Sequence, residues 1–227
     1  MEYFRFSYDV DSEDTGHVFP QVIFKNPKKL EPNPVLMANM ANHGQFPPDD
    51  ILPFDFLEVN NGAKITSVMS SPFNNGFLIN KKVKNILEKS CIDNFRFYKI
   101  KLLNKKVDLN EYYYFHSASN LKEYVDYPKS LFSANLLSDR PVYDLPKVNS
   151  WEELNIINKT LSNGLSVTAK CLYLKSNFPY NLDFFKLYAF DYDFYISNTL
   201  KDNLIKNGIN GIKIESAKGF IKTDNFS

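Results

Sequence analysis

Three histidines and two cysteines are the side chains of this 227-residue sequence best suited to metal binding or nucleophilic chemistry. His17, His43 and His116 share no metal-ligand spacing, and none of them lies near Cys91 or Cys171 along the chain. A metal site or a cysteine–histidine pair would therefore have to be assembled from distant segments. We expect a packed or edge position for His116 and two buried, reduced thiols for the cysteines. The sequence predicts no catalytic residue, no metal site and no cofactor.

Two pairs of acidic residues could perform acid–base chemistry. Asp49 and Asp50 are adjacent, and Asp191 and Asp193 are separated by one tyrosine. Carboxylates held close together can serve as general acid and general base, although carboxylates are mostly exposed, solvated groups. The sequence contains neither G-x-x-x-x-G-K-[ST] nor G-x-S-x-G. A hydrolase that uses Asp49, Asp50 or His116 remains an alternative, as does a ligand-binding protein whose site is built from scattered polar residues.

A segment that mixes aromatic and acidic side chains, YAFDYDFY, spans residues 188–195. Tyrosine is enriched in protein–protein interfaces, so this composition suits a protein-binding surface. The residues that we predict to contact a partner are Tyr188, Asp191, Tyr192 and Asp193. A strand that leads into the following unit is the other interpretation of the same segment.

The composition favours a folded protein without a broad charged surface. Hydrophobic residues make up 44% of the chain and aromatic residues 15%, which is enough for a sizeable core. The net charge is +1, and lysine heavily outnumbers arginine, which argues against nucleic-acid and membrane partners. We find no signal peptide and no apolar stretch of membrane-spanning length, so we expect a soluble, cytoplasmic protein.

The elements that must position these side chains include a unit that occurs twice. Residues 77–97 (FLINKKVKNILEKSCIDNFRF) align without a gap with residues 194–214 (FYISNTLKDNLIKNGINGIKI), at a constant offset of 117. The identical pairs are Phe77/Phe194, Ile79/Ile196, Lys84/Lys201, Leu87/Leu204, Lys89/Lys206 and Ile92/Ile209. We interpret this likeness as an internal duplication. Two common strand–helix–strand units that are alike only in composition are the second interpretation.

Each copy predicts a strand, a helix and a second strand. Asn80 and Ser197 are good N-cap residues, and Gly208 is a natural C-cap for the second helix. Asn94 and Gly211 tolerate the positive φ of a turn. The apolar positions at helical spacing are Val83, Ile86 and Leu87 in the first copy, and Leu200, Leu204 and Ile205 in the second.

Other segments carry simpler signals. Alternation predicts strands at residues 1–10, 111–117 and 165–175. Ser150 and Glu153 form a capping box that opens a helix through about residue 158. Residues 35–42 could form a short helix within an irregular N-terminal third.

These signals predict an α+β fold with a mixed sheet and an internally duplicated strand–helix–strand unit. We expect one domain over residues 1–227. A division into two subdomains, 1–145 with the first unit and 146–227 with the second, is the other arrangement considered.

The pattern of residues 194–214 resembles the C-terminal signature of a family of bacterial immunity proteins of polymorphic toxin systems. The family is the type numbered eleven, a former domain of unknown function. Its members end in an apolar strand, a Ser-capped helix and a Gly-Leu/Ile-x-Gly turn into a final strand. The matching residues here are Phe194, Ile196, Ser197, Leu200, Lys201, Gly208, Ile209, Gly211 and Ile214.

The middle of the chain is similar to the same family. Residues 77–89 resemble its first strand–helix segment, and residues 111–132 resemble its tyrosine-led strand, followed by Val125-Asp126 and Lys129-Ser130. The resemblance covers roughly residues 50–215. Two departures from the family pattern are Asn80 in place of a serine cap and a longer segment at residues 145–175.

The resemblance implies an immunity protein, or antitoxin, that binds and neutralises a cognate secreted toxin without chemistry of its own. Its implied partner is that protein toxin, in the cytoplasm, with no enzyme activity and no cofactor. A structural or regulatory protein that shares the fold is a third interpretation.

Overall fold

The computed structural model describes residues 2–10, 12–25, 46, 57–73, 75–136, 141–161, 164–187, 190 and 193–223. Helices and strands both occur, so the predicted α+β class is confirmed. The strands are β1 (Tyr3–Tyr8), β2 (Val22–Phe24), β3 (Leu57–Val59), β4 (Val68–Met69), β5 (Gly76–Asn80), β6 (Phe95–Lys99), β7 (Leu102–Asn104), β8 (Val107–Asp108), β9 (Tyr112–Ser117), β10 (Leu131–Leu136), β11 (Pro141–Asp144), β12 (Leu165–Leu174), β13 (Phe184–Lys186), β14 (Phe194–Ser197), β15 (Ile212–Ser216) and β16 (Ile221–Thr223). The helices are α2 (Lys81–Leu87), α3 (Trp151–Thr160) and α4 (Asn198–Lys206), with short 3₁₀ turns η3 (Lys122–Tyr124) and η4 (Tyr127–Lys129).

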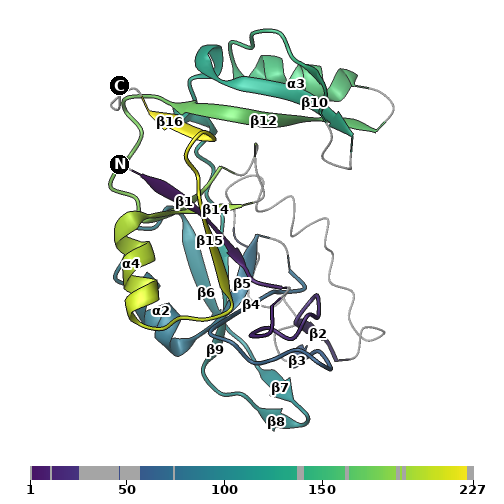
Figure 1. Cartoon of the computed structure of the whole chain (residues 1–227), viewed down its shortest axis with the longest axis vertical. Helices are drawn as coiled ribbons and strands as arrows, with labels where there is room; N and C mark the ends of the chain where they lie inside the picture. The colour runs from purple at the N-terminus through teal and green to yellow at the C-terminus, as the bar shows by residue number, and fades with distance from the viewer. Residues whose placement is uncertain are drawn as a thin grey trace.

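The described strands form four four-stranded sheets rather than the one mixed sheet that we predicted (Figure 1). Their orders are β4-β5-β9-β6, β13-β14-β1-β15, β2-β3-β7-β8 and β11-β10-β12-β16. The first two are antiparallel throughout, whereas β3–β7 and β12–β16 are parallel pairs in the other two. The repeated units lie in the two antiparallel sheets, which we call, together with α2 and α4, the central body.

The two sheets of the central body have the same order and the same register. The flanking strands of each repeated unit do not pair with each other. Instead β9 lies between β5 and β6, and β1, from the start of the chain, lies between β14 and β15. Phe77 pairs with Phe115 in the first sheet, and Phe194 pairs with Phe6 at the matching place in the second. The sequence did not indicate that a third strand would enter each unit.

A shared core fills the space between these two sheets. The rings of Phe77 and Phe194, which occupy matching positions, meet with centroids 5.2 Å apart. Phe6 and Phe115 approach Phe184 from the two middle strands, with centroids 5.8 and 5.1 Å from its ring. Side chains of α2 and α4 complete the same core. Neither unit therefore buries its apolar face without the other.

Hydrogen bonds join the edges of the two sheets in a reciprocal way. Asp93 N–H, in the turn after α2, donates to Phe184 C=O on β13 over 3.2 Å. Val68 N–H on β4 donates to Asn210 C=O, in the turn after α4, also over 3.2 Å. The turn after each helix is thus hydrogen-bonded to the edge strand of the opposite sheet, β13 or β4. These bonds join the two sheets at both edges of the shared core.

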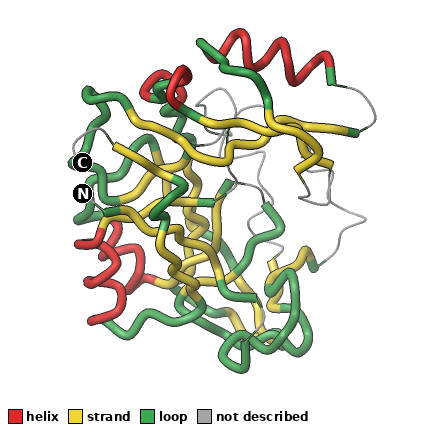
Figure 2. Tube along the Cα trace, turned by 45° about the horizontal axis from the view of Figure 1, so that its top comes forward, coloured by secondary structure: helices red, strands yellow, loops and turns green. Residues whose placement is uncertain are grey.

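Helices α2 and α4 lie side by side at one side of the molecule, outside the strands (Figures 1 and 2). The predicted caps are present, because Asn80 Oδ1 accepts the N–H of Val83 over 3.0 Å and Ser197 Oγ accepts that of Leu200 over 3.1 Å. Five of the six predicted apolar positions are buried. The prediction for Ile205 is wrong: its side chain is 61% exposed. Helix α4 turns Leu200 and Leu204 inward, and this orientation turns Ile205 to solvent.

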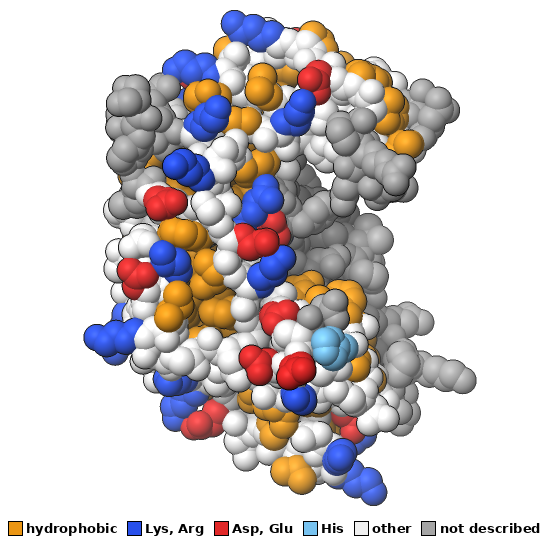
Figure 3. All heavy atoms as spheres, viewed as in Figure 1, with side chains coloured by type: hydrophobic (Ala, Val, Ile, Leu, Met, Phe, Trp, Pro, Cys, Tyr) orange, Lys and Arg blue, Asp and Glu red, His pale blue; other side chains and the backbone are white. Residues whose placement is uncertain are grey.

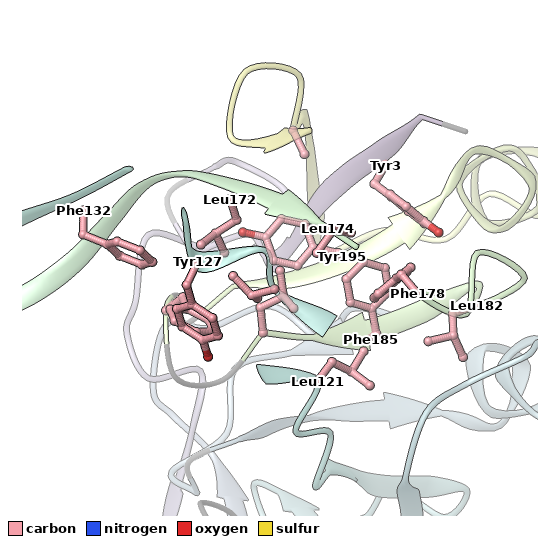
Figure 4. Packing of buried hydrophobic residues seen from close by; sticks show 14 of the residues in the cluster. Tyr3, Leu121, Tyr127, Phe132, Leu172, Leu174, Phe178, Leu182, Phe185 and Tyr195 are labelled. Atoms are coloured by element: carbon pink, nitrogen blue, oxygen red, sulfur yellow. The ribbon is translucent and has the colours of Figure 1, made fainter. Parts of the chain in front are cut away.

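The outer face of each sheet of the central body carries its own cover. Over β13-β14-β1, aromatic and aliphatic side chains pack against β10, β12 and α3 (Figure 4). There, the rings of Tyr3 and Phe185 meet edge to face at 4.9 Å. Over β4-β5-β9-β6, the cover comes from β2, β3 and β7. The two covers come from unrelated segments, so the matching sheets present different surfaces.

The other strands predicted above and the predicted cap of α3 are confirmed. The strands predicted at residues 1–10, 111–117 and 165–175 appear as β1, β9 and β12. Ser150 caps α3, since its Oγ accepts Glu153 N–H over 3.2 Å. The helix predicted at residues 35–42 lies outside the described residues. None of the described helices has the length and apolar character needed to cross a membrane.

A glycine substitution should test the close approach between the two units. Gly211 has φ +76°, and a Cβ there would lie 2.2 Å from Val68 O. Gly211→Ala should lower the free energy of unfolding by at least about 3 kcal/mol, because strain and a backbone clash add. Gly208→Ala is the matched control, since Gly208 has φ +63° and open space around its Cβ position, and it should cost about 1 kcal/mol. Equal losses in urea unfolding would contradict the close approach.

Candidate functional site

The residues predicted to contact a partner fall mostly outside the described part of the chain. Tyr188, Asp191 and Tyr192 lie outside the described residues. Asp193 directly precedes β14, has a partly exposed side chain, and places Oδ2 3.8 Å from Arg5 Nε. Contact between these four residues and a partner stays a prediction.

The histidines do not gather into one site. His17 is exposed in the loop before β2, and His116 is fully buried on β9. His43 lies outside the described residues, as do Asp49 and Asp50. Within the described ranges, no group of three or more histidine, cysteine, aspartate or glutamate side chains could hold a metal ion. The hydrolase alternative therefore has only His116 of its named residues in the described structure.

One thiol is buried and the other is exposed, which corrects the expectation of two buried thiols. Cys171 is buried on β12, and burial raises the pKa of its thiol. Cys91 is exposed in the turn after α2, where its Sγ accepts from Asn181 Nδ2 over 3.5 Å. Its C=O accepts Asp183 N–H over 2.6 Å, and its N–H donates to Asp183 Oδ2 over 3.0 Å.

The structure also gathers polar residues around the buried His116; among them Arg96 is exposed and Asn75 is partly exposed. Tyr114 Oη lies 3.1 Å from His116 Nδ1, and Arg96 pairs with His116 on the neighbouring strand β6. Lys186, at the end of β13, is only 3% exposed and donates from Nζ to Asn75 Oδ1 over 2.9 Å. Asn75 directly precedes β5, the strand on the other side of His116. We call these five residues the His116 cluster.

Burial and positive charge keep the imidazole neutral. Burial, as the largest cause, and the charges of Lys186 and Arg96 together lower the pKa of His116 to about 4. Its Nε2 is buried and has no hydrogen-bond partner among the described residues. Burial also raises the pKa of Tyr114 well above its ordinary value, so the phenol stays protonated. The cluster at neutral pH is a neutral imidazole beside two cations.

A second set of contacts links the His116 cluster to the turn before β6. Ser119 Oγ donates to Asp93 Oδ2 over 2.6 Å and accepts the backbone N–H of Lys186 over 3.2 Å. Burial raises the pKa of the Asp93 carboxyl, while the hydrogen bond from Ser119 opposes this rise. These contacts hold β13 in place, and with it the buried Lys186.

This arrangement fits a structural role or an anion-accepting role better than hydrolysis. A histidine with a pKa of about 4 is a weak general base at neutral pH. A catalytic histidine is usually oriented by a carboxylate at its second nitrogen, whereas the described partner of His116 is the hydroxyl of Tyr114. The unpartnered Nε2 beside two cations is the one feature that favours a ligand-binding interpretation.

Sequence reasoning missed the cluster because its parts are not close along the chain. The alternation of Tyr112, Tyr114 and His116 shows that these three share one face of a strand. No sequence signal places Lys186, which lies 70 residues later, beside them. Only the meeting of β13 with the turn before β6 does so.

No protein-family model matches the chain, and a search of the curated proteins finds no match either. The functions considered below therefore depend on the residues, their geometry and the resemblance described above.

The depressed pKa of His116 predicts a loss of stability in acid. The unfolded histidine binds a proton below its ordinary pKa of about 6.5, whereas the folded one does so only near 4. The contribution of His116 is complete above about pH 6.5, falls as the pH is lowered from there to about 4, and is about 3 kcal/mol in total. Urea unfolding between pH 7.5 and 4 measures this slope.

Two variants serve as controls for this pH dependence. His116→Phe should remove that part of the slope, whatever its stability at pH 7. His17→Asn, which removes an exposed histidine outside the His116 cluster, is the matched control. A His116→Phe protein with the wild-type slope would show that another group causes the acid sensitivity.

Proposed function

We propose that this chain is a cytoplasmic immunity protein that binds a bacterial protein toxin and neutralises it without chemistry of its own. The observation that carries the proposal is where the residues of the resemblance lie. Phe194 and Ile196 are in the shared core, Ser197 caps α4, and Gly211 lies against Val68. Each of these residues serves the fold of the second unit, and this structural role supports the proposal.

Neutralisation by binding requires a surface that forms a tight complex, and it requires no catalytic group. A nanomolar complex corresponds to about −12 kcal/mol, and an interface of standard size buries roughly 1,600 Å². The described surface offers exposed apolar side chains of the kind that interfaces bury. The nine large apolar side chains with high exposure are Phe19, Ile65, Val107, Leu131, Leu136, Val142, Tyr143, Ile156 and Ile205.

A ligand-binding protein is the second candidate function, and the His116 cluster is the observation that favours it. A neutral imidazole with an unpartnered Nε2, next to Arg96 and Lys186, could accept an anionic group. His116 is fully buried, so such a ligand would have to be enclosed by the protein.

Co-expression with the product of the adjacent upstream gene tests the proposal. The immunity function predicts a stable complex on co-purification and rescue of growth in cells that express that product. His116→Phe should rescue growth as well as the wild type, because neutralisation does not use the imidazole. Loss of rescue by folded His116→Phe would favour the ligand-binding candidate, and the absence of both complex and rescue with the wild type would overturn the immunity proposal.

We also propose that the two units of the central body arose by internal duplication. The support is that β4-β5-β9-β6 and β13-β14-β1-β15 share strand order and register. In both units a helical lysine lies over an aromatic ring at a matching position of the middle strand, Lys84 over Tyr113 and Lys201 over Phe4. The middle strand follows its unit in the first copy and comes from the N-terminus in the second, as in a circular permutation.

A chimera tests whether the two units are interchangeable. Replacing residues 80–90 by the sequence of residues 197–207 should give a protein that unfolds cooperatively in urea. The free energy of unfolding should fall by about 1–3 kcal/mol, because the exchange replaces the buried Ile86 by asparagine. A scrambled segment of the same composition is the control and should not fold. Failure of both chimera and control would count against equivalence of the units.

A further inference from the structure

The hairpin of β7 and β8 projects from the lower end of the molecule (Figure 1). Asn104 pairs with Val107, which leaves a two-residue turn at the tip. The two turn residues, Lys105 and Lys106, have φ of +47° and +74°. Positive φ at both positions is the pattern of a type I′ turn.

The residues at this tip are not those that the turn itself favours. A type I′ turn selects asparagine and glycine, because a Cβ atom is crowded at positive φ; glycine has none, and the short polar side chain of asparagine tolerates this conformation. Lysine at both positions gives up local stability at an exposed site, where packing does not require it. Strained residues that persist in this way are typical of functional segments.

The hairpin and its base carry unpaired positive charge. Lys99, Lys101, Lys105 and Lys106 are all exposed, and none of them forms an ion pair with the described acidic side chains. The acidic residues nearest in sequence are Asp108 and Glu111, of which Glu111 binds Lys81 over 2.6 Å. The segment is therefore basic in a protein whose net charge is only +1.

An apolar side chain lies directly beside these cations. Val107 is 65% exposed, the highest value among the large apolar side chains of the described chain. Figure 3 shows hydrophobic and basic side chains at the lower end of the molecule, where Figure 1 places β7 and β8. Val107 follows Lys105 and Lys106 and precedes the exposed Asp108. A small apolar contact beside two cations suits insertion into a narrow cleft with acidic walls.

The base of the hairpin is fixed in the protein core. Leu102, at the start of β7, is fully buried and pairs with Leu57 on β3. Leu109 N–H donates to Leu102 C=O over 2.7 Å and closes the base. A rigid base lowers the entropy that binding would cost.

Two other surfaces are weaker candidates. Helices α2 and α4 also carry lysines, but Lys81, Lys84 and Lys201 already pair with acidic side chains. Strand β11 exposes Val142 and Tyr143. Its register shifts next to Pro141, and both features hinder the addition of another strand.

We propose that the β7–β8 hairpin enters the partner and that the partner is a protein with a cleft lined by aspartate and glutamate side chains. This inference rests on the proposed immunity function and specifies its contact surface. Carboxylate-lined clefts are common catalytic sites, so a basic hairpin that fills one would block a toxin without any reaction. Lys105 and Lys106 supply the charge, and Val107 supplies the apolar contact.

The test compares two hairpin variants in complex formation with the product of the adjacent upstream gene. Lys105→Glu/Lys106→Glu reverses the charge of the tip, and Lys105→Asn/Lys106→Gly removes the charge while giving the turn its preferred residues. Both should raise the dissociation constant more than about tenfold. The Asn-Gly variant should also raise Tm by about 2–4 °C, because the strain of the turn is relieved. A more stable protein that binds less well cannot be explained by damage to the fold.

Two control variants locate the surface. Lys89→Glu/Lys206→Glu changes the helix pair, and Val142→Ser/Tyr143→Ser changes β11; both should bind like the wild type. The association rate of the wild type should fall as salt is raised from 50 to 500 mM, and this dependence should be weaker in the Asn-Gly variant. Wild-type binding by both hairpin variants would overturn this inference while leaving the immunity proposal intact. No complex with the wild-type protein would overturn both.

Discussion

The central body depends on one constraint: the first strand of the chain must lie between two strands near its end. β1 pairs with β14 on one side and β15 on the other, and it brings Phe6 against Phe77 and Phe184. Until β1 is in place, the second sheet has no middle strand and the shared core has no closed wall. The start of the chain, the first unit and the second unit therefore have to assemble together, and neither unit is expected to be stable alone.

Different covers on two matching sheets give the molecule its distinct surfaces. One sheet is covered by β10, β12 and α3, and the other by β2, β3 and β7. The β7–β8 hairpin belongs to the second cover, and the antiparallel pair β10–β11 belongs to the first. The two sheets therefore share strand order and register, whereas the segments that cover them differ.

In the His116 cluster, the contact between the two units buries polar side chains. Lys186 is carried by β13 of one sheet and His116 by β9 of the other, and both are buried. Lys186 is satisfied in part by Asn75, whereas His116 stays neutral and its Nε2 has no partner in the described part of the chain. A buried cation and a neutral imidazole are costly to keep, so this region is where protonation acts most directly on stability.

The sequence by itself determined the local elements, because caps, periodicity and turn residues act over a few neighbouring residues. Asn80, Ser197, Ser150 and Gly208 carry such signals, and the structure confirms the helices that they bound. Only the tertiary structure decided that β1 and β9 separate the strands of each unit, that Ile205 faces solvent and that Lys186 meets His116. These outcomes depend on contacts between residues far apart along the chain, and a local pattern contains no information on which distant surface will cover it.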